Sequence, residues 1–206
     1  PIIDRTELVN TTVHTVSKNL IEGVILVSII VFIFLYNWRT TFIVASVIPL
    51  AMLFAIIMMN TFGVSGNLMS LGALDFGLIV DGAVIIVEAI LHHLHSTKKY
   101  KGIDTLSQED MDKEVTGSAG RMMNAAVFGQ IIILIVYLPI LSLEGIEGKM
   151  FKPMAQTVAF AILGAFILSL TYVPMVSSLF ISKKMNHKPN LSDRIMARLE
   201  FYYEKW

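Results

Sequence analysis

The chain has 206 residues, of which 55% are hydrophobic and 16% are charged, against roughly 25% charged residues in an average soluble domain. Its 16 basic and 16 acidic residues cancel to a formal net charge of zero. This composition excludes a disordered chain, and it disfavours a nucleic-acid-binding protein, which usually needs a basic excess. The absence of cysteine excludes disulfides, thiolate metal sites and cysteine nucleophiles.

Five long apolar segments account for the hydrophobic excess. Each has 17 to 27 residues, and about 20 helical residues cross a hydrocarbon core of about 30 Å. The segments are apolar nearly all round, whereas a soluble core helix carries a polar stripe and a barrel strand alternates. We therefore expect an all-α, polytopic membrane protein with five transmembrane helices. The predicted helices cover residues 20–36, 41–59, 68–91, 122–143 and 155–181.

Polar segments flank the predicted membrane domain, residues 20–181. Residues 1–19 are expected to form an external, periplasmic lead-in, and residues 182–206 a cytoplasmic helix on the membrane surface. Residues 92–121 form the long predicted cytoplasmic loop. Because the chain begins with Pro1 and carries no signal peptide ahead of an external segment, we expect it to be part of a larger protein.

A helix start is predicted inside the long loop. Ser107 followed three residues later by Asp110 is typical of an N-cap with an acidic partner. This pattern predicts a surface helix over about residues 108–117.

Lys and Arg are divided unevenly between the two sides of the predicted membrane. Four of them, Arg5, Lys18, Lys149 and Lys152, lie on the side of the N-terminus, and the other twelve lie on the opposite side. Cytoplasmic loops carry the excess of basic residues in membrane proteins. We therefore expect the N-terminus in the periplasm and the C-terminus in the cytoplasm.

The third predicted helix differs from the others because it carries Asp75, Asp81 and Glu88. A carboxylate at the bilayer centre costs about 2.5–3.5 kcal/mol on insertion scales. On a helix, Asp81 and Glu88 lie within about 20° of one face and about 10 Å apart, with Asp75 about 9 Å before Asp81 and roughly 120° around. Such a ladder fits one metal ion poorly but suits stepwise proton transfer. Gly72, Gly77 and Gly82 lie beside the acids and leave room there for water or a close helix partner.

A purely structural role for these acids would require basic partners. No Lys or Arg lies within the other four predicted helices. Charged residues inside membrane segments are usually functional, so proton or ion coupling is the favoured interpretation.

Three motifs surround these acids: Asp75-Phe76-Gly77, Asp81-Gly82-Ala83 and Val87-Glu88. They resemble the fourth-helix signature of the heavy-metal efflux branch of the resistance–nodulation–division transporters, the Czc-type cation pumps. Ala89 stands where the family usually has Asn. The other blocks that carry the resemblance are residues 4–10, 138–141, 144–155 and 169–174.

The resemblance implies that this chain comprises helices two to six of an inner-membrane antiporter. Such a pump uses the proton motive force to export divalent cations of cobalt, zinc, cadmium or nickel. It needs no cofactor and is a transporter rather than an enzyme. The family works as a homotrimer with a periplasmic adaptor and an outer-membrane channel. Asp75, Asp81 and Glu88 match its proton-carrying acids, and the chain's other expected partners are the rest of its own polypeptide and the lipid bilayer.

Several alternatives stay open. Twelve methionines, which are soft ligands, are compatible with a copper or silver exporter, although Met also fills irregular helix contacts. A drug or lipid exporter of the same superfamily also carries aspartates in its fourth helix. A five-helix module of the sterol-sensing type shares the predicted topology.

Three histidines, His92, His93 and His95, follow the last acid. Neighbouring positions do not share one helix face, so His92 and His93 are poorly placed to bind one metal ion together. A basic collar at the membrane surface is the favoured interpretation.

Polar and small residues in the last two predicted helices indicate how these helices pack. Asn124, Gln130 and Thr171 could face the acids, but hydrogen bonding between helices is the favoured role for each. Ala161, Ala165 and Ser169 recur every four residues and predict a face of small side chains that allows close packing.

Overall fold

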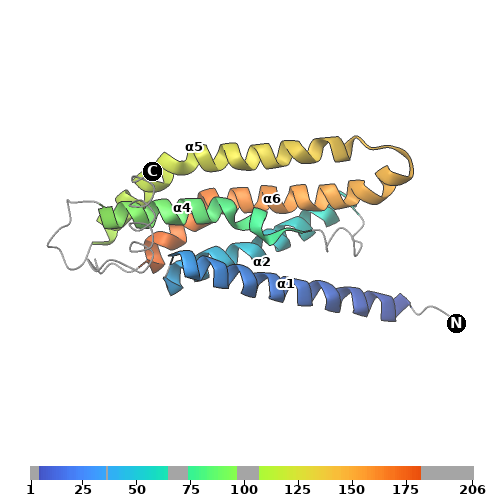
Figure 1. Cartoon of the computed structure of the whole chain (residues 1–206), viewed down its shortest axis with the longest axis horizontal. Coiled ribbons are helices and arrows are strands. Elements are labelled where there is room, and N and C mark those ends of the chain that lie inside the picture. The colour runs from blue at the N-terminus through green and yellow to red at the C-terminus, as the bar shows by residue number, and fades with distance from the viewer. Residues whose placement is uncertain (1–4, 36, 65–73, 97–106, 182–206) are drawn as a thin grey trace, which may run out of the picture.

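The computed structural model describes residues 5–35, 37–64, 74–96 and 107–181, which form five α-helices (Figure 1). These helices are α1 (Arg5–Leu35), α2 (Trp38–Thr61), α4 (Phe76–Ser96), α5 (Gln108–Leu141) and α6 (Gly145–Phe180). All five are long and apolar enough to cross a membrane. The all-α fold with five membrane-spanning helices, predicted from hydropathy, is confirmed. The surface helix predicted over residues 182–206 lies outside the described residues.

Three helices begin well before the apolar segments that predicted them. α1 begins at Arg5, so most of the predicted polar lead-in is helical. α5 begins at Gln108, and the surface helix expected over residues 108–117 is the first part of this longer helix. α6 begins at Gly145, about ten residues early. Hydropathy marks the apolar part of a helix, whereas the backbone hydrogen bonds continue through polar residues until a cap ends them.

Side-chain caps begin α5 and α2 at the same end of the bundle. The Ser107 hydroxyl accepts a hydrogen bond from the Asp110 backbone N–H at 3.2 Å and donates one to Asp110 Oδ2 at 2.7 Å, as the sequence predicted. Asn37 Oδ1 accepts from the Arg39 backbone N–H at 3.1 Å at the start of α2. The Arg39 side chain also donates to the carbonyl oxygen of Phe180, at 3.3 Å, and thereby joins α2 to the end of α6.

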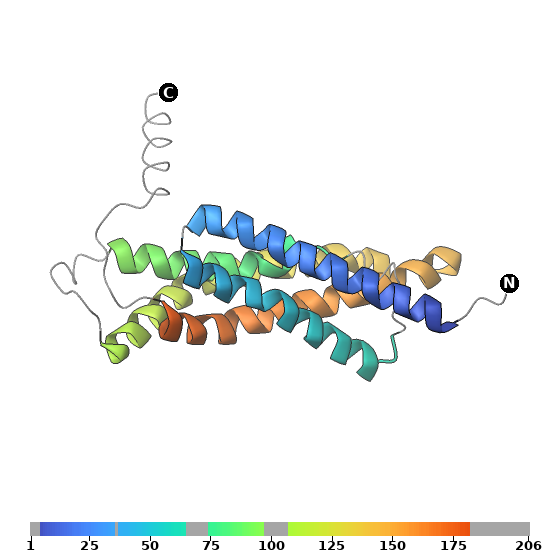
Figure 2. The same ribbon diagram turned by 90° about the horizontal axis from the view of Figure 1, so that it is seen from below.

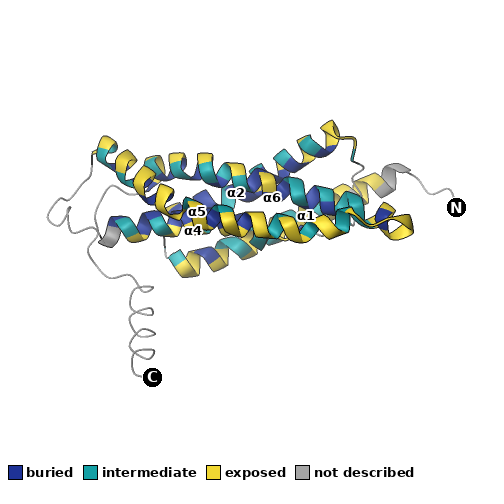
Figure 3. Ribbon diagram, turned by 90° about the horizontal axis from the view of Figure 1, so that it is seen from above, coloured by how far each residue is buried: buried dark blue, intermediate teal, exposed yellow. Residues whose placement is uncertain are grey.

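α6 occupies the middle of the bundle and packs against α2, α4 and α5 (Figures 1 and 2). α1 lies on the outside and packs against α2 and α4. Val31 is the one buried residue among the α1 side chains that the structure describes, and most of the others are exposed (Figure 3). The structural core therefore lies between α2, α4, α5 and α6.

Small residues bring α6 close to its neighbours. Ala161 and Ala165 are fully buried and Ser169 is almost so, which confirms the predicted face of small side chains. Gly164 lies against the ring of Phe54 in α2, and a Cβ at Gly164 would come within 2.6 Å of Phe54 Cδ1. The absence of a side chain at this glycine thus sets the separation of α2 and α6.

We predict that Gly164→Ala destabilises the full-length protein by about 1–3 kcal/mol, because the added methyl group overpacks the α2–α6 contact. Gly117→Ala is the matched control, because no atom lies within 4 Å of its added Cβ. Alanine is favoured over glycine inside a helix by about 0.5–1 kcal/mol, so this control should be neutral or stabilising. Thermal unfolding in detergent measures both changes, and equal midpoints for the two variants would contradict the packing argument.

Candidate functional site

The two sides of α4 differ in chemistry. Its apolar side packs into the core through eight buried residues: Ile79, Val80, Ala83, Ile86, Val87, Ile90, Leu91 and Leu94. Asp81, Ile85, Glu88 and His92 follow at helical spacing on the opposite side, and all four are exposed. The acids of α4 therefore lie along one stripe that the described parts of the other helices leave uncovered.

Asp75 occupies a different position from the one predicted. The expected helix over residues 68–91 placed Asp75 near its middle, but α4 begins only at Phe76. Asp75 Oδ1 accepts a hydrogen bond from the Gly77 backbone N–H at 2.8 Å, which makes Asp75 the N-cap of α4. Its negative charge is also favourable beside a helix N-terminus. The helical angle of about 120° expected between Asp75 and Asp81 therefore does not apply.

The three predicted acids follow one another along the chain, from the residue before α4 to the later part of that helix. Asp75, Asp81 and Glu88 are all exposed, and the carboxylates of Asp75 and Asp81 are close enough to interact electrostatically. Glu88 lies about 10 Å further along α4 than Asp81, which is two helical turns. That separation exceeds a hydrogen bond, so a proton passing between them needs a water molecule or another side chain in between.

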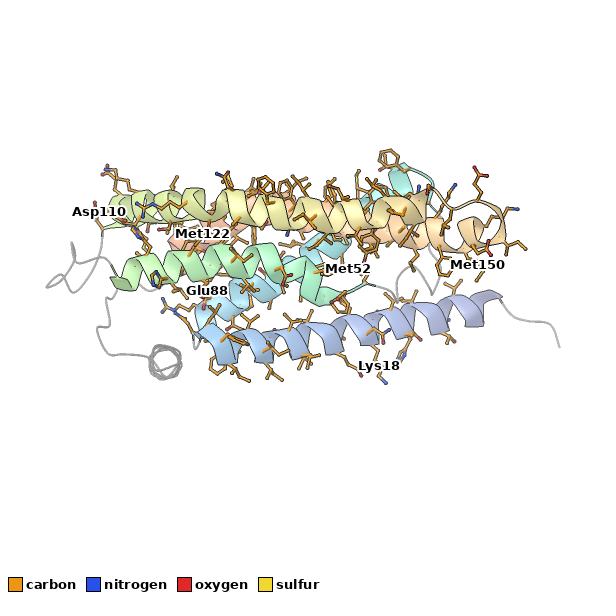
Figure 4. The ribbon with its side chains drawn as sticks, turned by 45° about the horizontal axis from the view of Figure 1, so that its top comes forward. Lys18, Met52, Glu88, Asp110, Met122 and Met150 are labelled. Atoms are coloured by element: carbon orange, nitrogen blue, oxygen red, sulfur yellow. The ribbon has the colours of Figure 1, made fainter. Side chains whose placement is uncertain are left out.

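A cavity of about 420 Å³ lies beside Glu88, between α4 and α5. This volume accommodates several water molecules, since each occupies roughly 30 Å³ in the liquid. Figure 4 shows Glu88 on α4 and Met122 on α5, which both line the cavity. The other lining residues are Ile85, Ala89, His92, His93, Ser118 and Arg121. Glu88 therefore faces a space that also contains basic groups.

The histidines at the end of α4 have different surroundings. His93 Nε2 lies 2.7 Å from Glu114 Oε2, a contact that joins the end of α4 to the first part of α5. His92 is exposed and lines the cavity beside Glu88. The side chain of His95 lies outside the described residues. Within the described parts of the chain, no three His, Asp or Glu side chains are grouped so that they could hold a metal ion.

The methionines that the structure describes include packing residues. Met52 and Met59 belong to the core, and the Thr157 hydroxyl donates to the Met59 sulfur at 3.4 Å. These contacts fit the interpretation that Met fills irregular spaces between helices.

Gln130 is buried without a hydrogen-bond partner in the described part of the chain, which sequence reasoning did not predict. Its side chain is only 2% exposed, and neither its Nε2 nor its Oε1 has a hydrogen-bond partner among the described residues. An unpaired buried polar group of this kind costs about 1–3 kcal/mol. The expected hydrogen bond between helices is therefore not present at Gln130. The prediction is thus wrong for Gln130. The Thr171 hydroxyl is exposed and donates to the Ile167 carbonyl of its own helix at 2.7 Å.

The absence of a side chain at Gly82 allows the Gln130 amide to approach the backbone of α4. A Cβ at Gly82 would lie 2.5 Å from Gln130 Nε2 and 3.1 Å from Ser169 Oγ. The predicted close helix partner of Gly82 is thus confirmed, and it comes from both α5 and α6. The position of Gly82 directly after Asp81 was the sequence signal for a close approach of another helix. The sequence did not show which side chains make this contact.

A family model described as the AcrB/AcrD/AcrF family matches residues 1–206. The chain is similar to the cobalt-zinc-cadmium resistance protein CzcA of Cupriavidus metallidurans, with 48% identity over 203 residues, which are 98% of this chain and 19% of that protein. It is also similar to the nickel and cobalt resistance protein CnrA of the same organism, with 46% identity over 206 residues, covering 100% of this chain and 19% of that protein. The chain thus spans about a fifth of the length of these relatives.

The chain is also similar to solved structures. The chain matches the crystal structure of a heavy metal efflux pump with a TM-score of 0.70 and 41% sequence identity. The match covers 87% of this chain and 17% of the chain in that structure.

The N-cap role of Asp75 yields a stability prediction. Asp75→Ala should destabilise the protein by about 0.5–2 kcal/mol because the Gly77 N–H loses its partner, whereas Asp75→Asn should have little effect because Asn is an equally good N-cap. Thermal unfolding of the full-length variants in detergent measures both effects. Equal destabilisation by Ala and Asn would show that the carboxylate charge, and not the cap, stabilises this end of α4.

Proposed function

Because this chain belongs to the AcrB/AcrD/AcrF family of transporters, we propose that the protein carrying it is a proton-driven antiporter that exports divalent heavy-metal cations across the cell envelope. The observation that carries the proposal is the exposed stripe of acids on a membrane-spanning helix. Carboxylates in such helices are costly and mark ion and proton pathways. The relatives support the metal class, because their names are those of cobalt, zinc, cadmium and nickel resistance proteins.

In the proposed mechanism, Asp81 and Glu88 bind and release the protons that drive export, with Asp75 as the first acid of the series. A proton enters at Asp75 or Asp81 and moves through bridging water to Glu88. The cavity beside Glu88 supplies water at the end of α4 where His92 and Arg121 also lie. Protonation removes the negative charge from a carboxylate and so changes which charged groups α4 attracts. The resulting change in contacts couples proton movement to a conformational change.

The proposed setting follows from the same family resemblance. The chain forms part of the inner-membrane subunit, with its N-terminus in the periplasm and its C-terminus in the cytoplasm. The distribution of Lys and Arg supports this orientation. The remainder of the polypeptide covers the acidic stripe, and the pump works as a homotrimer with a periplasmic adaptor and an outer-membrane channel.

We predict that Asp81→Asn and Glu88→Gln reduce proton-driven cation transport to the background rate while the protein stays folded, because an amide cannot carry a proton between donor and acceptor. Asp75→Asn should likewise reduce transport without loss of stability. Glu109→Gln is the matched control, since Glu109 is an exposed acid in an ordinary surface pair with Lys113. Transport is measured in proteoliposomes that contain the full-length protein and a pH gradient. Transport at the parental rate by the Asp81→Asn variant would refute the mechanism.

A tolerance profile of cells tests the metal class. Cells that produce the full-length protein should tolerate higher cobalt, zinc, cadmium or nickel concentrations than cells that produce its Asp81→Asn variant. Copper, silver and drug tolerance should be equal in the two strains. Protection against only copper, silver or drugs would identify a different branch of the superfamily.

A further inference from the structure

Charges of opposite sign line the cavity between α4 and α5. Glu88 contributes a carboxylate from α4, and Arg121 contributes a guanidinium group from α5. Both side chains are exposed. The charge of His92 and His93, which also line the cavity, depends on whether they are protonated, whereas arginine stays charged. Arg121 is therefore the permanent cation among the residues that line this cavity.

The contact between His93 and Glu114 sets Glu88 and Arg121 at nearly the same level of the bundle. Its nitrogen and oxygen atoms lie 2.7 Å apart, and α4 ends where α5 begins, so the two helices run antiparallel (Figure 1). From this contact toward the middle of the helices, Glu88 is five residues away on α4 and Arg121 is seven residues away on α5. These separations are about 7.5 and 10.5 Å, so the two residues differ in level by about 3 Å.

Arg121 lies on the side of α5 that meets α4. It follows Glu114 by seven residues, which places the two within about 20° of one helix face. The Glu114 carboxylate contacts α4 at His93, and the buried Ser118, between Glu114 and Arg121 in the chain, lines the same cavity. Because the guanidinium group is carried on a long, flexible stem, a change of its rotamer brings it toward Glu88.

Loss of the Glu88 proton creates an attraction that the protonated acid lacks. An ionised carboxylate accepts two parallel hydrogen bonds from the planar N–H fork of arginine. The attraction between the two charges is stronger beside apolar groups than in bulk water, and Ile85, Ala89 and Met122 contribute such groups to the cavity wall. The uncharged, protonated carboxyl group attracts Arg121 much less.

Other charged groups of this chain lie further away or are engaged elsewhere. Arg39, at the start of α2, donates to the Phe180 carbonyl at 3.3 Å. Asp81 lies two helical turns before Glu88, at about 10 Å. Three stretches of the helices packed against α4 contain no Asp, Glu, Lys, Arg or His: residues 23–35 of α1, 40–61 of α2 and 153–180 of α6. All these groups, and those of the remaining polypeptide, are the same in every full-length variant compared below.

We propose that Arg121 is a positioning residue that pairs with Glu88 after the acid has lost its proton, and that this pair draws α5 onto α4 and closes the cavity. Uptake of a proton forms an O–H bond on the carboxylate, removes its charge and releases Arg121, which keeps its own protons. Both side chains are exposed and the cavity lies between the helices, so the structure shows the open arrangement. The proposal rests on the proposed function, because it assigns Glu88 a proton.

The pair makes proton release at Glu88 directional. The open cavity holds the water that accepts the proton from Glu88. Once this proton has left, the ion pair closes the cavity and excludes the water, so the proton does not return from the same side. A new proton then reaches Glu88 from the direction of Asp81, breaks the pair and reopens the cavity.

The test measures how fast a thiol in the cavity wall is labelled. The chain contains no cysteine, so Ala89→Cys places a reporter next to Glu88 in the wall. The full-length reporter protein in proteoliposomes is treated with a membrane-permeant maleimide at one fixed, mildly alkaline pH, and mass spectrometry of the peptide gives the rate. Glu88→Gln and Arg121→Gln should each raise this rate by about threefold to tenfold, because each removes the charge pair that holds the cavity closed.

The direction of these effects separates closure of the cavity from a change in thiol acidity. Removal of the negative charge of Glu88 favours the reactive thiolate, whereas removal of the positive charge of Arg121 disfavours it. Charge alone therefore moves the two rates in opposite directions, whereas loss of the ion pair raises both. The double variant should label at the rate of either single variant, because both substitutions break the same pair.

Two further variants are controls. Lysine keeps the positive charge without the fork, so Arg121→Lys should label more slowly than Arg121→Gln. Lys113→Gln removes a positive charge from the same helix, from an exposed pair with Glu109, and should label at the parental rate. A rate for Arg121→Gln at or below the parental rate, or equal to that of Arg121→Lys or Lys113→Gln, would overturn the proposal.

Transport by the same full-length protein separates this proposal from the antiport mechanism, because labelling does not depend on transport. If Glu88→Gln transports at the parental rate, the proposed role of Glu88 in antiport fails, and faster labelling of both single variants still supports the ion pair. If Glu88→Gln abolishes transport but neither single variant labels faster, the antiport mechanism stands and the proposed role of Arg121 is refuted.

Discussion

The close packing of α6 against its neighbours is the constraint on which the rest of the bundle depends. Helices in a membrane gain little from the hydrophobic effect between them, so they associate through close contact of small residues. Gly164 permits that contact with α2, and Ala161, Ala165 and Ser169 continue the close-packed face. With α6 held in the middle, α4 and α5 pack on it and on each other, and the polar contact at Gly82 follows from that arrangement.

The division of α4 into two faces connects this packing to function. Its apolar side meets α2, α5 and α6, which leaves Asp81 and Glu88 on the opposite side. The core thus holds the helix in place without surrounding its charges. In the proposed mechanism, protonation of either acid changes the contacts on the open side of α4. Gly82 follows Asp81 directly and admits the Gln130 amide of α5 against the backbone of α4.

Asp75 and Gln130 show why part of the site was beyond sequence reasoning. An aspartate in an apolar segment is interpreted as a charge inside a helix. Whether it instead caps the helix depends on which residue begins the helix, and hydropathy does not locate that residue. The apolar run predicted a helix through Asp75, whereas α4 begins after it. For Gln130, the pattern predicted a hydrogen bond between helices. Its burial without a partner depends on three helices meeting at Gly82.

Hydropathy by itself determined the five membrane-spanning helices, because the cost of an unpaired backbone in hydrocarbon leaves few alternatives for long apolar segments. The motifs around Asp81 and Glu88 determined the family, because these residue types at these spacings are rare in a membrane helix. Only the structure decided where α1 and α6 begin, that Asp75 is a cap, and which side chain meets Gly82. The contact at Gly82 depends on residues far apart in the chain, which a local pattern does not encode.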